Sequence, residues 1–156
     1  MKKLIFLLLT FIVAQVAIAQ QKPFLSLDAA KKMGTLAEEK SEAAGYKMNI
    51  AIVDDGGQLV YFVRMDGAKL SGLDIAIKKA VCAAYYEAST ESYQKRIADG
   101  TLQLIGMPHM LPFEGGVPLK VGDTVVGAIG VSGATAAQDG DIADLAVALF
   151  EELTKD

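Results

Sequence analysis

Segment 114–139, EGGVPLKVGDTVVGAIGVSGATAAQD, constrains the fold more than any other part of the chain. Apolar residues, many of them β-branched, lie on both sides of Gly122-Asp123, a pattern typical of two strands joined by a hairpin turn. Glycines occur at 115 and 116 before the first strand and at 127, 130 and 133 in and after the second strand. Glycine has no side chain to pack and loses much backbone entropy on folding. We therefore expect an antiparallel hairpin whose glycines lie where backbones approach closely or where φ is positive.

A second hairpin is predicted nearer the middle of the chain. Segments 48–53 and 59–64 are rich in β-branched and aromatic residues and are joined across Asp54-Asp55-Gly56-Gly57, a typical turn composition. Capping residues and helical periodicity predict helices at 26–44, capped by Ser26, at 71–89, at 90–98 and after Asp139, which caps the last one. Hairpin-linked strands pair antiparallel, so we expect an α+β fold in which helices flank an antiparallel sheet.

The first 19 residues predict a cleaved signal peptide. Two lysines precede an apolar run at 4–16, and Ala17-Ile18-Ala19 has the small residues that signal peptidase recognises. The apolar run is short for a membrane-spanning helix. We therefore expect one domain, residues 20–156, exported to the periplasm or the outside of the cell, with no membrane anchor after cleavage.

Composition excludes two kinds of partner. The chain has 15 Lys and Arg against 19 Asp and Glu, a formal net charge of −4, and it lacks the basic clusters that bind nucleic acid. Cys82, the only cysteine, lies among alanines, which predicts a buried thiol. One cysteine and one histidine cannot form a conventional zinc site.

His109 is the only histidine and lies in the least regular predicted loop, with Met107 and Met110 beside it. Proline on both sides restricts the backbone of this loop. Imidazole and thioether groups are common axial ligands of haem iron, which makes His109 a candidate metal ligand. The alternative is a surface-loop histidine flanked by two packing methionines.

Basic residues elsewhere are candidates for binding an anion. Arg64 has the planar fork that suits a carboxylate, and the alternative is an ion pair with Asp66 or another acidic residue. Lys78 and Lys79 lie in the middle of a very apolar predicted helix. One of them is expected to face inward against a carboxylate or an anionic substrate, unless both reach the surface with buried stems.

Several blocks of sequence, in the same order, resemble the GlcG/HbpS family of haem-binding and haem-degrading proteins, which includes the C-terminal domain of PduO proteins. The blocks are IAIVDDGG at 50–57, RMDGA at 64–68, Lys79-Ala80 with Ala83-Ala84, EGGVPL at 114–119, GAIGVSG at 127–133 and Gln138-Asp139. The resemblance spans residues 27–150. It implies a profilin-like or PAS-like α-β-α sandwich that assembles as a homo-oligomer.

The same resemblance implies a haem site in the loop before the Gly-Gly-x-Pro turn, which is 107–113 in this chain. The expected cofactor-binding residues are His109 as the metal ligand, Met110, Met107, Arg64, Lys79, Gly115 and Gly116. One feature differs from the family: some haem-binding relatives have a histidine in the first helix, and segment 26–44 has none.

Two functions stay open at this point. The first is an exported haem-binding protein that stores, senses or degrades haem, with a sensor protein as a candidate partner. The second is a module or enzyme of the GlcG type that uses no haem and binds a small carboxylate through Arg64 and Lys79. The sequence does not decide whether the chain is an enzyme.

Overall fold

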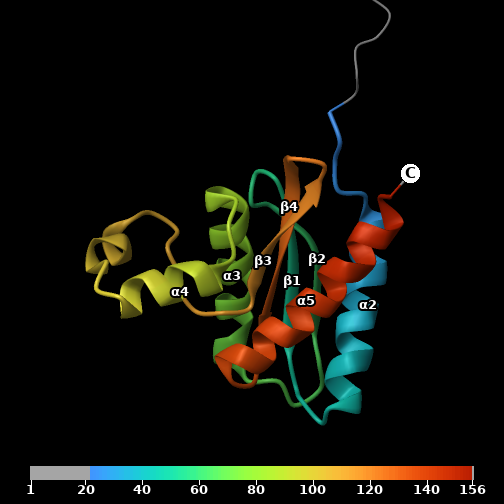
Figure 1. The fold of residues 1–156 in the computed structure, drawn as a ribbon. Helices are drawn as coiled ribbons and strands as arrows, with labels where there is room; N and C mark the ends of the chain where they lie inside the picture. The colour runs from blue at the N-terminus through green and yellow to red at the C-terminus, as the bar shows by residue number, and fades with distance from the viewer. Residues whose placement is uncertain (1–21, 156) are drawn as a thin grey trace, which may run out of the picture.

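The computed structural model describes residues 22–155, so the predicted signal peptide at 1–19 lies outside the described residues. The elements follow the predicted order (Figure 1): α2 (Leu27–Ala43), β1 (Asn49–Asp54), β2 (Leu59–Arg64), α3 (Leu70–Tyr86), α4 (Thr90–Ala98), the 3-10 helix η1 (Leu102–Gly106), β3 (Gly116–Val121), β4 (Thr124–Ser132) and α5 (Ala136–Leu153). None of these described helices has the length and apolarity needed to cross a membrane.

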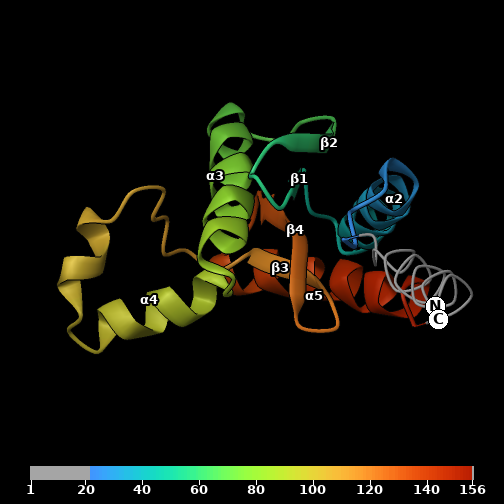
Figure 2. The ribbon, with the colours of Figure 1, turned by 90° about the horizontal axis from the view of Figure 1, so that it is seen from above.

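The four strands form one antiparallel sheet in the order β2-β1-β4-β3. Both predicted hairpins are present, and the pairing of β1 with β4 joins them across the centre of the sheet. Helix α3 covers one face, while α2 and α5 cover the other (Figure 1). Figure 2 shows α4 and η1 extending away from the sheet on the α3 side. The predicted α+β architecture is therefore confirmed.

The two faces of the sheet have different cores. Side chains of β1 alternate between them, as the period of a strand requires. Ile50 and Ile52 belong to the larger core beneath α2 and α5, whereas Ala51 and Val53 face α3. The core under α3 is built mainly from alanines, so this helix lies close to the sheet: Ala76, Ala80, Ala83, Ala84 and Ala128.

Two glycines allow the backbone of α3 to touch the sheet. Gly116 and Gly130 are register partners in β3 and β4. A Cβ atom added at Gly116 would lie 2.4 Å from the carbonyl oxygen of Lys79, and one at Gly130 would lie 2.1 Å from that of Ala76. These glycines occur where backbones approach closely, as the glycine-rich pattern predicts.

A buried ion pair joins α3, β4 and α5. The Lys79 side chain is 2% exposed, and its Nζ lies 2.7 Å from Asp139 Oδ2 and 2.9 Å from the carbonyl oxygen of Val131. The other carboxylate oxygen of Asp139 accepts hydrogen bonds of 3.0 Å from the backbone N–H groups of Gly133 and Ala134. Burial lowers the pKa of Lys79, and the nearby Asp139 carboxylate opposes that shift. Lys79 is thus the lysine that faces inward.

The predicted start of the last helix is wrong by one turn. Thr135, not Asp139, is the N-cap: its side chain accepts from the N–H of Gln138, whose side chain accepts from the Thr135 N–H in return. This reciprocal capping box satisfies two N–H groups at the helix start. Asp139 instead lies inside the first turn, where its carboxylate is engaged by Lys79.

The predicted end of α3 is also too late. The helix ends at Tyr86 rather than at residue 89, because Glu87 takes a left-handed conformation with φ of 53°. Such a residue cannot continue a right-handed helix.

The contact between α3 and the sheet predicts a clear cost for adding a methyl group. Gly130→Ala is expected to lower the free energy of unfolding by about 1–3 kcal/mol, because the new Cβ collides with α3 backbone. Gly106→Ala is the matched control, since nothing lies within 4 Å of its Cβ position. Urea unfolding of both variants checks this, and equal stabilities would contradict the close contact.

The buried ion pair predicts a non-additive mutation series. Lys79→Met strands the Asp139 carboxylate and is expected to cost about 3–5 kcal/mol of folding free energy. Asp139→Asn removes the charge but keeps an oxygen for the N–H groups of Gly133 and Ala134. The double variant should therefore be more stable than Lys79→Met alone in urea unfolding. A double variant that loses the sum of both single effects would rule out this coupling.

Candidate functional site

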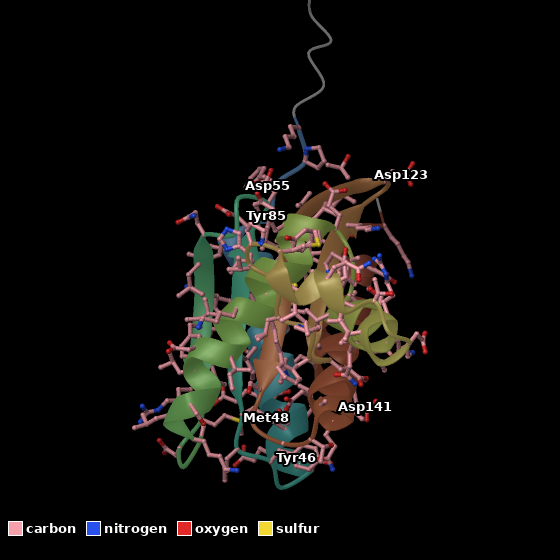
Figure 3. All side chains as sticks on the ribbon, turned by 90° about the vertical axis from the view of Figure 1, so that its left-hand side faces the viewer. Tyr46, Met48, Asp55, Tyr85, Asp123 and Asp141 are labelled. Atoms are coloured by element: carbon pink, nitrogen blue, oxygen red, sulfur yellow. The ribbon has the colours of Figure 1, made fainter. Side chains whose placement is uncertain are left out.

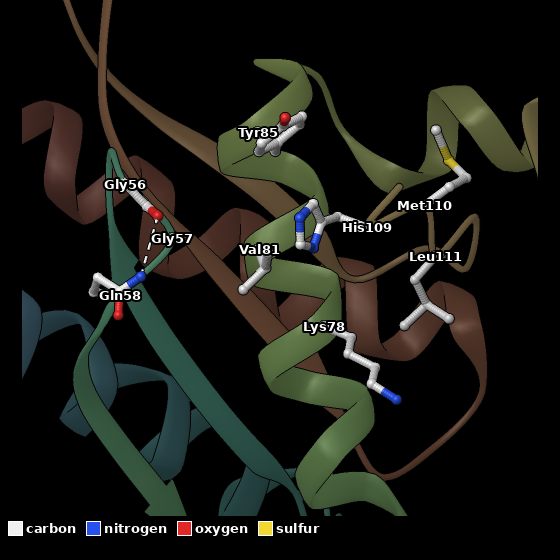
Figure 4. Close-up of a pocket in the computed structure, with 9 residues that line it drawn as sticks. All are labelled: Gly56, Gly57, Gln58, Lys78, Val81, Tyr85, His109, Met110 and Leu111. Atoms are coloured by element: carbon white, nitrogen blue, oxygen red, sulfur yellow. Dashed lines mark hydrogen bonds between the residues drawn. The ribbon is translucent and has the colours of Figure 1, made fainter. Parts of the chain in front are cut away.

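A pocket of about 660 Å³ lies between α3, the loop after η1 and the β1–β2 turn (Figure 4). We call it the α3 pocket, and nine residues line it: Gly56, Gly57, Gln58, Lys78, Val81, Tyr85, His109, Met110 and Leu111. Its volume is within the range of about 300–1,000 Å³ that is usual for small-molecule sites. Two of the predicted site residues, His109 and Met110, are among these nine.

One face of α3 supplies three of the lining residues. Lys78, Val81 and Tyr85 are three and four positions apart, so they project from the same side of the helix. Figure 3 shows Tyr85 and Asp55 at the same end of the molecule, where the β1–β2 turn lies, with Tyr46 and Met48 at the opposite end. The pocket is therefore formed where the end of α3 meets that turn.

Hydrogen bonds attach the 107–113 loop to the helices beside it. The Tyr86 hydroxyl donates to the carbonyl oxygen of Pro108, and the Leu111 N–H donates to Cys82 Sγ at 3.5 Å. Thr90 Oγ1 donates to the carbonyl oxygen of Phe113 at 2.7 Å. Cys82 is buried, as predicted, and burial raises the pKa of its thiol. The loop is thus held in place by side chains of α3 and α4.

His109 occupies a backbone position that normally favours glycine. Its φ is 59°, it follows Pro108, and the Met110 N–H donates to the Met107 carbonyl oxygen at 3.3 Å. A proline followed by a residue of positive φ, closed by this hydrogen bond, is the pattern of a type II turn. Histidine in the left-handed region is uncommon, and such outliers cluster at functional sites.

The imidazole ring of His109 is exposed and faces the pocket. In Figure 4 it extends from the loop across α3, between Tyr85 and Lys78, towards the β1–β2 turn. Its ring centroid lies 4.9 Å from that of Tyr85, with the two planes tilted by 47°. Packing against Tyr85 leaves the imidazole accessible to a ligand from the pocket.

The two methionines have different positions. Met110 lines the pocket, but its sulfur lies 4.0 Å from Cys82 Sγ. Met107 is 37% exposed and is not a lining residue. Of the two methionines beside His109, only Met110 lines the α3 pocket, and its sulfur lies against Cys82 of α3.

The structure does not bring Arg64 or Lys79 to His109. Arg64 pairs with Asn49 in the sheet register, at the end of β2 opposite to the turn that lines the pocket. At about 3.3 Å per residue, it lies roughly 16 Å along the strand from Leu59. Lys79 is buried beneath α3 and paired with Asp139. Neither residue lines the pocket.

Gly115 and Gly116 also lie away from the pocket lining, because they pack around Lys79. A Cβ atom at Gly115, whose φ is 118°, would lie 2.8 Å from Lys79 Nζ. Gly116 contacts the Lys79 backbone, as described above. The Gly-Gly pair thus accommodates the buried lysine rather than a ligand of the α3 pocket.

The sequence did not indicate that the β1–β2 turn and Lys78 line the same pocket as His109. The sequence predicts a turn at 54–57, but the position of this turn beside His109 depends on how the sheet packs against α3. Lys78 could have been found from helical spacing, because it shares a face with Val81 and Tyr85, whereas Lys79 points the other way.

The side chains of the α3 pocket suit a haem. Among the side chains that line the pocket, the accessible imidazole of His109 is a usual axial ligand of haem iron. Val81, Leu111 and the Tyr85 ring offer apolar contact to a porphyrin. A planar apolar ligand with a metal at its centre is therefore compatible with this lining.

Comparisons with known proteins agree with this chemistry. Residues 25–148 match the HbpS-like family of haem-degrading proteins. Protein GlcG of Escherichia coli K12 is 34% identical over 111 residues, which are 71% of this chain and 83% of GlcG.

Two crystal structures extend the comparison to the fold. A double mutant of HbpS from Streptomyces reticuli is 32% identical, with a TM-score of 0.78 over 85% of this chain and 91% of that one. A PduOC–haem complex is 27% identical, with a TM-score of 0.74 over 81% and 94% of the two chains. The family match, the curated relative and the shared fold together show that this chain belongs to the HbpS-like family of haem-degrading proteins.

Proposed function

We propose that this chain is an exported haem-binding protein, that haem lies in the α3 pocket, and that His109 is the iron ligand. The observation that carries the proposal is the conformation of His109: the only imidazole of the chain has a positive φ and faces a pocket. The left-handed conformation costs about 1–2 kcal/mol for a residue other than glycine. Backbone outliers of this kind cluster at functional sites, which supports a role for the His109 side chain.

Apolar contact would supply most of the affinity. Burying apolar surface contributes about 25 cal/mol per Å², and a porphyrin presents two apolar faces. Val81 and Leu111 provide aliphatic contact, and the ring of Tyr85 lies beside His109. The sulfur of Met110 is against Cys82, so we assign Met110 to the wall of the pocket rather than to the iron.

Export and self-association are parts of the same proposal. The basic, apolar and small-residue pattern of residues 1–19 supports export. Large apolar side chains are exposed on η1 and the following loop, which supports a homo-oligomer in which a second copy covers them: Leu102, Ile105, Met107 and Phe113.

The small-carboxylate alternative finds less support. It requires Arg64 and Lys79 to act together in one cleft. Lys79 is buried in an ion pair with Asp139, and Arg64 is at the far end of β2 from the α3 pocket. The residues that this alternative needs are not brought together.

Titration with haemin tests the proposal. Residues 20–156 are expected to give a saturable change in Soret absorbance, and His109→Ala to weaken binding at least about tenfold and shift the band, because the iron loses its imidazole ligand. Met107→Leu is the matched control, since Met107 lies in the same loop outside the pocket lining. A saturable change that is the same in His109→Ala would remove His109 from the site, and no saturable change in the unmodified chain would overturn haem binding.

The conformation of His109 predicts that glycine and alanine at this position differ in folding stability, although both substitutions weaken haemin binding. In the protein without haem, His109→Gly should be more stable than His109→Ala by about 1 kcal/mol, since glycine takes a positive φ without steric cost. Neither variant should bind haemin as the unmodified chain does. Urea unfolding of both variants measures the difference, and equal stabilities would show that the turn holds no strain.

A further inference from the structure

The one charged side chain in the lining of the α3 pocket has the opposite sign to the net charge of the chain. The sequence carries a formal net charge of −4. The pocket lining contains the ammonium group of Lys78 and no carboxylate. A pocket that is locally basic in an acidic protein favours a ligand with a negative group.

Lys78 is the basic residue of this lining that is available to such a group. Among residues 22–155, the ion pairs involve Lys22, Lys32, Lys79 and Lys95, and Lys78 takes part in none of them. Its side chain is exposed. Asp74, one helical turn before it, forms no ion pair with it. The ammonium group is therefore free to meet an anion at the pocket rim.

The position of Lys78 along α3 fits a ligand that reaches His109. Lys78, Val81 and Tyr85 form a row on one face of the helix, and the His109 ring lies between the Tyr85 and Lys78 side chains in Figure 4. A planar ring that contacts the imidazole would therefore have Tyr85 near one edge and Lys78 towards the opposite edge. An acidic substituent on that second edge would meet the ammonium group.

We propose that Lys78 binds a carboxylate of the ligand at the rim of the α3 pocket, so that the site selects planar apolar molecules with a free acid group. For a haem, that group is a propionate. This inference rests on the proposed function, because it names the residue that orients the ligand bound there. It assigns to Lys78 the role that sequence reasoning gave to Arg64 and Lys79.

The test combines two ligands with a set of lysine variants. Haemin and its dimethyl ester share the same ring and iron, but the ester has no free carboxylate. Lys78→Gln is expected to weaken haemin binding about three- to fivefold, the range of an exposed ion pair, and to leave binding of the ester unchanged. Raising the salt concentration should weaken haemin binding to the unmodified chain more than to Lys78→Gln, because exposed charges are screened.

Two control variants separate this role from a general effect of charge. Lys78→Arg keeps the cation and should restore haemin binding. Lys31→Gln removes an exposed lysine from α2, on the other face of the sheet, and should bind both ligands as the unmodified chain does. The Soret maximum with haemin should be the same in all three variants, since none of them changes His109.

The outcomes distinguish this inference from the proposed function. Equal haemin affinities in Lys78→Gln and the unmodified chain, or equal affinities of the unmodified chain for haemin and the ester, would overturn the role of Lys78 and leave the haem site standing. Failure of the unmodified chain to bind either ligand would overturn both. A loss of affinity confined to haemin and to Lys78→Gln supports the inference.

Discussion

The buried pair of Lys79 and Asp139 is the interaction on which the arrangement of the molecule depends. One ammonium group reaches a carbonyl of β4 and a carboxylate of α5, so a single side chain of α3 connects both layers of helices through the sheet. The other oxygen of Asp139 holds the loop that leads into α5. Charges this deeply buried are tolerated only when both are paired and hydrogen-bonded. The Gly115-Gly116 pair leaves the space that the lysine occupies.

The same pair determines which side of α3 is free for a ligand. Because Lys79 and the alanines of α3 face the sheet, Lys78, Val81 and Tyr85 face outward. The 107–113 loop then lies along this outer face and brings His109 to it. Two adjacent lysines thus have separate roles: one is part of the core, and the other is at the rim of the pocket.

Much of the fold could be predicted from the sequence, because hairpin turns, helix periodicity and close-packing glycines are local signals. The start of α5 could not, since the carboxylate of Asp139 was free to cap a helix or to pair with a distant lysine, and the tertiary contact prevailed. For the site, His109 and Met110 line the α3 pocket, and their role in binding a cofactor stays a prediction. Arg64 and Lys79 were expected at the site because their side chains suit an anion, and the Gly-Gly pair because it follows the His109 loop. Their place depends instead on strand register and on which side of α3 faces the sheet.

The central claim is that a haem lies in the α3 pocket with its iron on His109. A crystal structure of residues 20–156 with haemin, with data collected at the iron absorption edge, tests it most directly. The account predicts an anomalous iron peak within bonding distance of an imidazole nitrogen of His109, between α3 and the β1–β2 turn. An iron peak elsewhere on the molecule, with the α3 pocket free of porphyrin density, would contradict it.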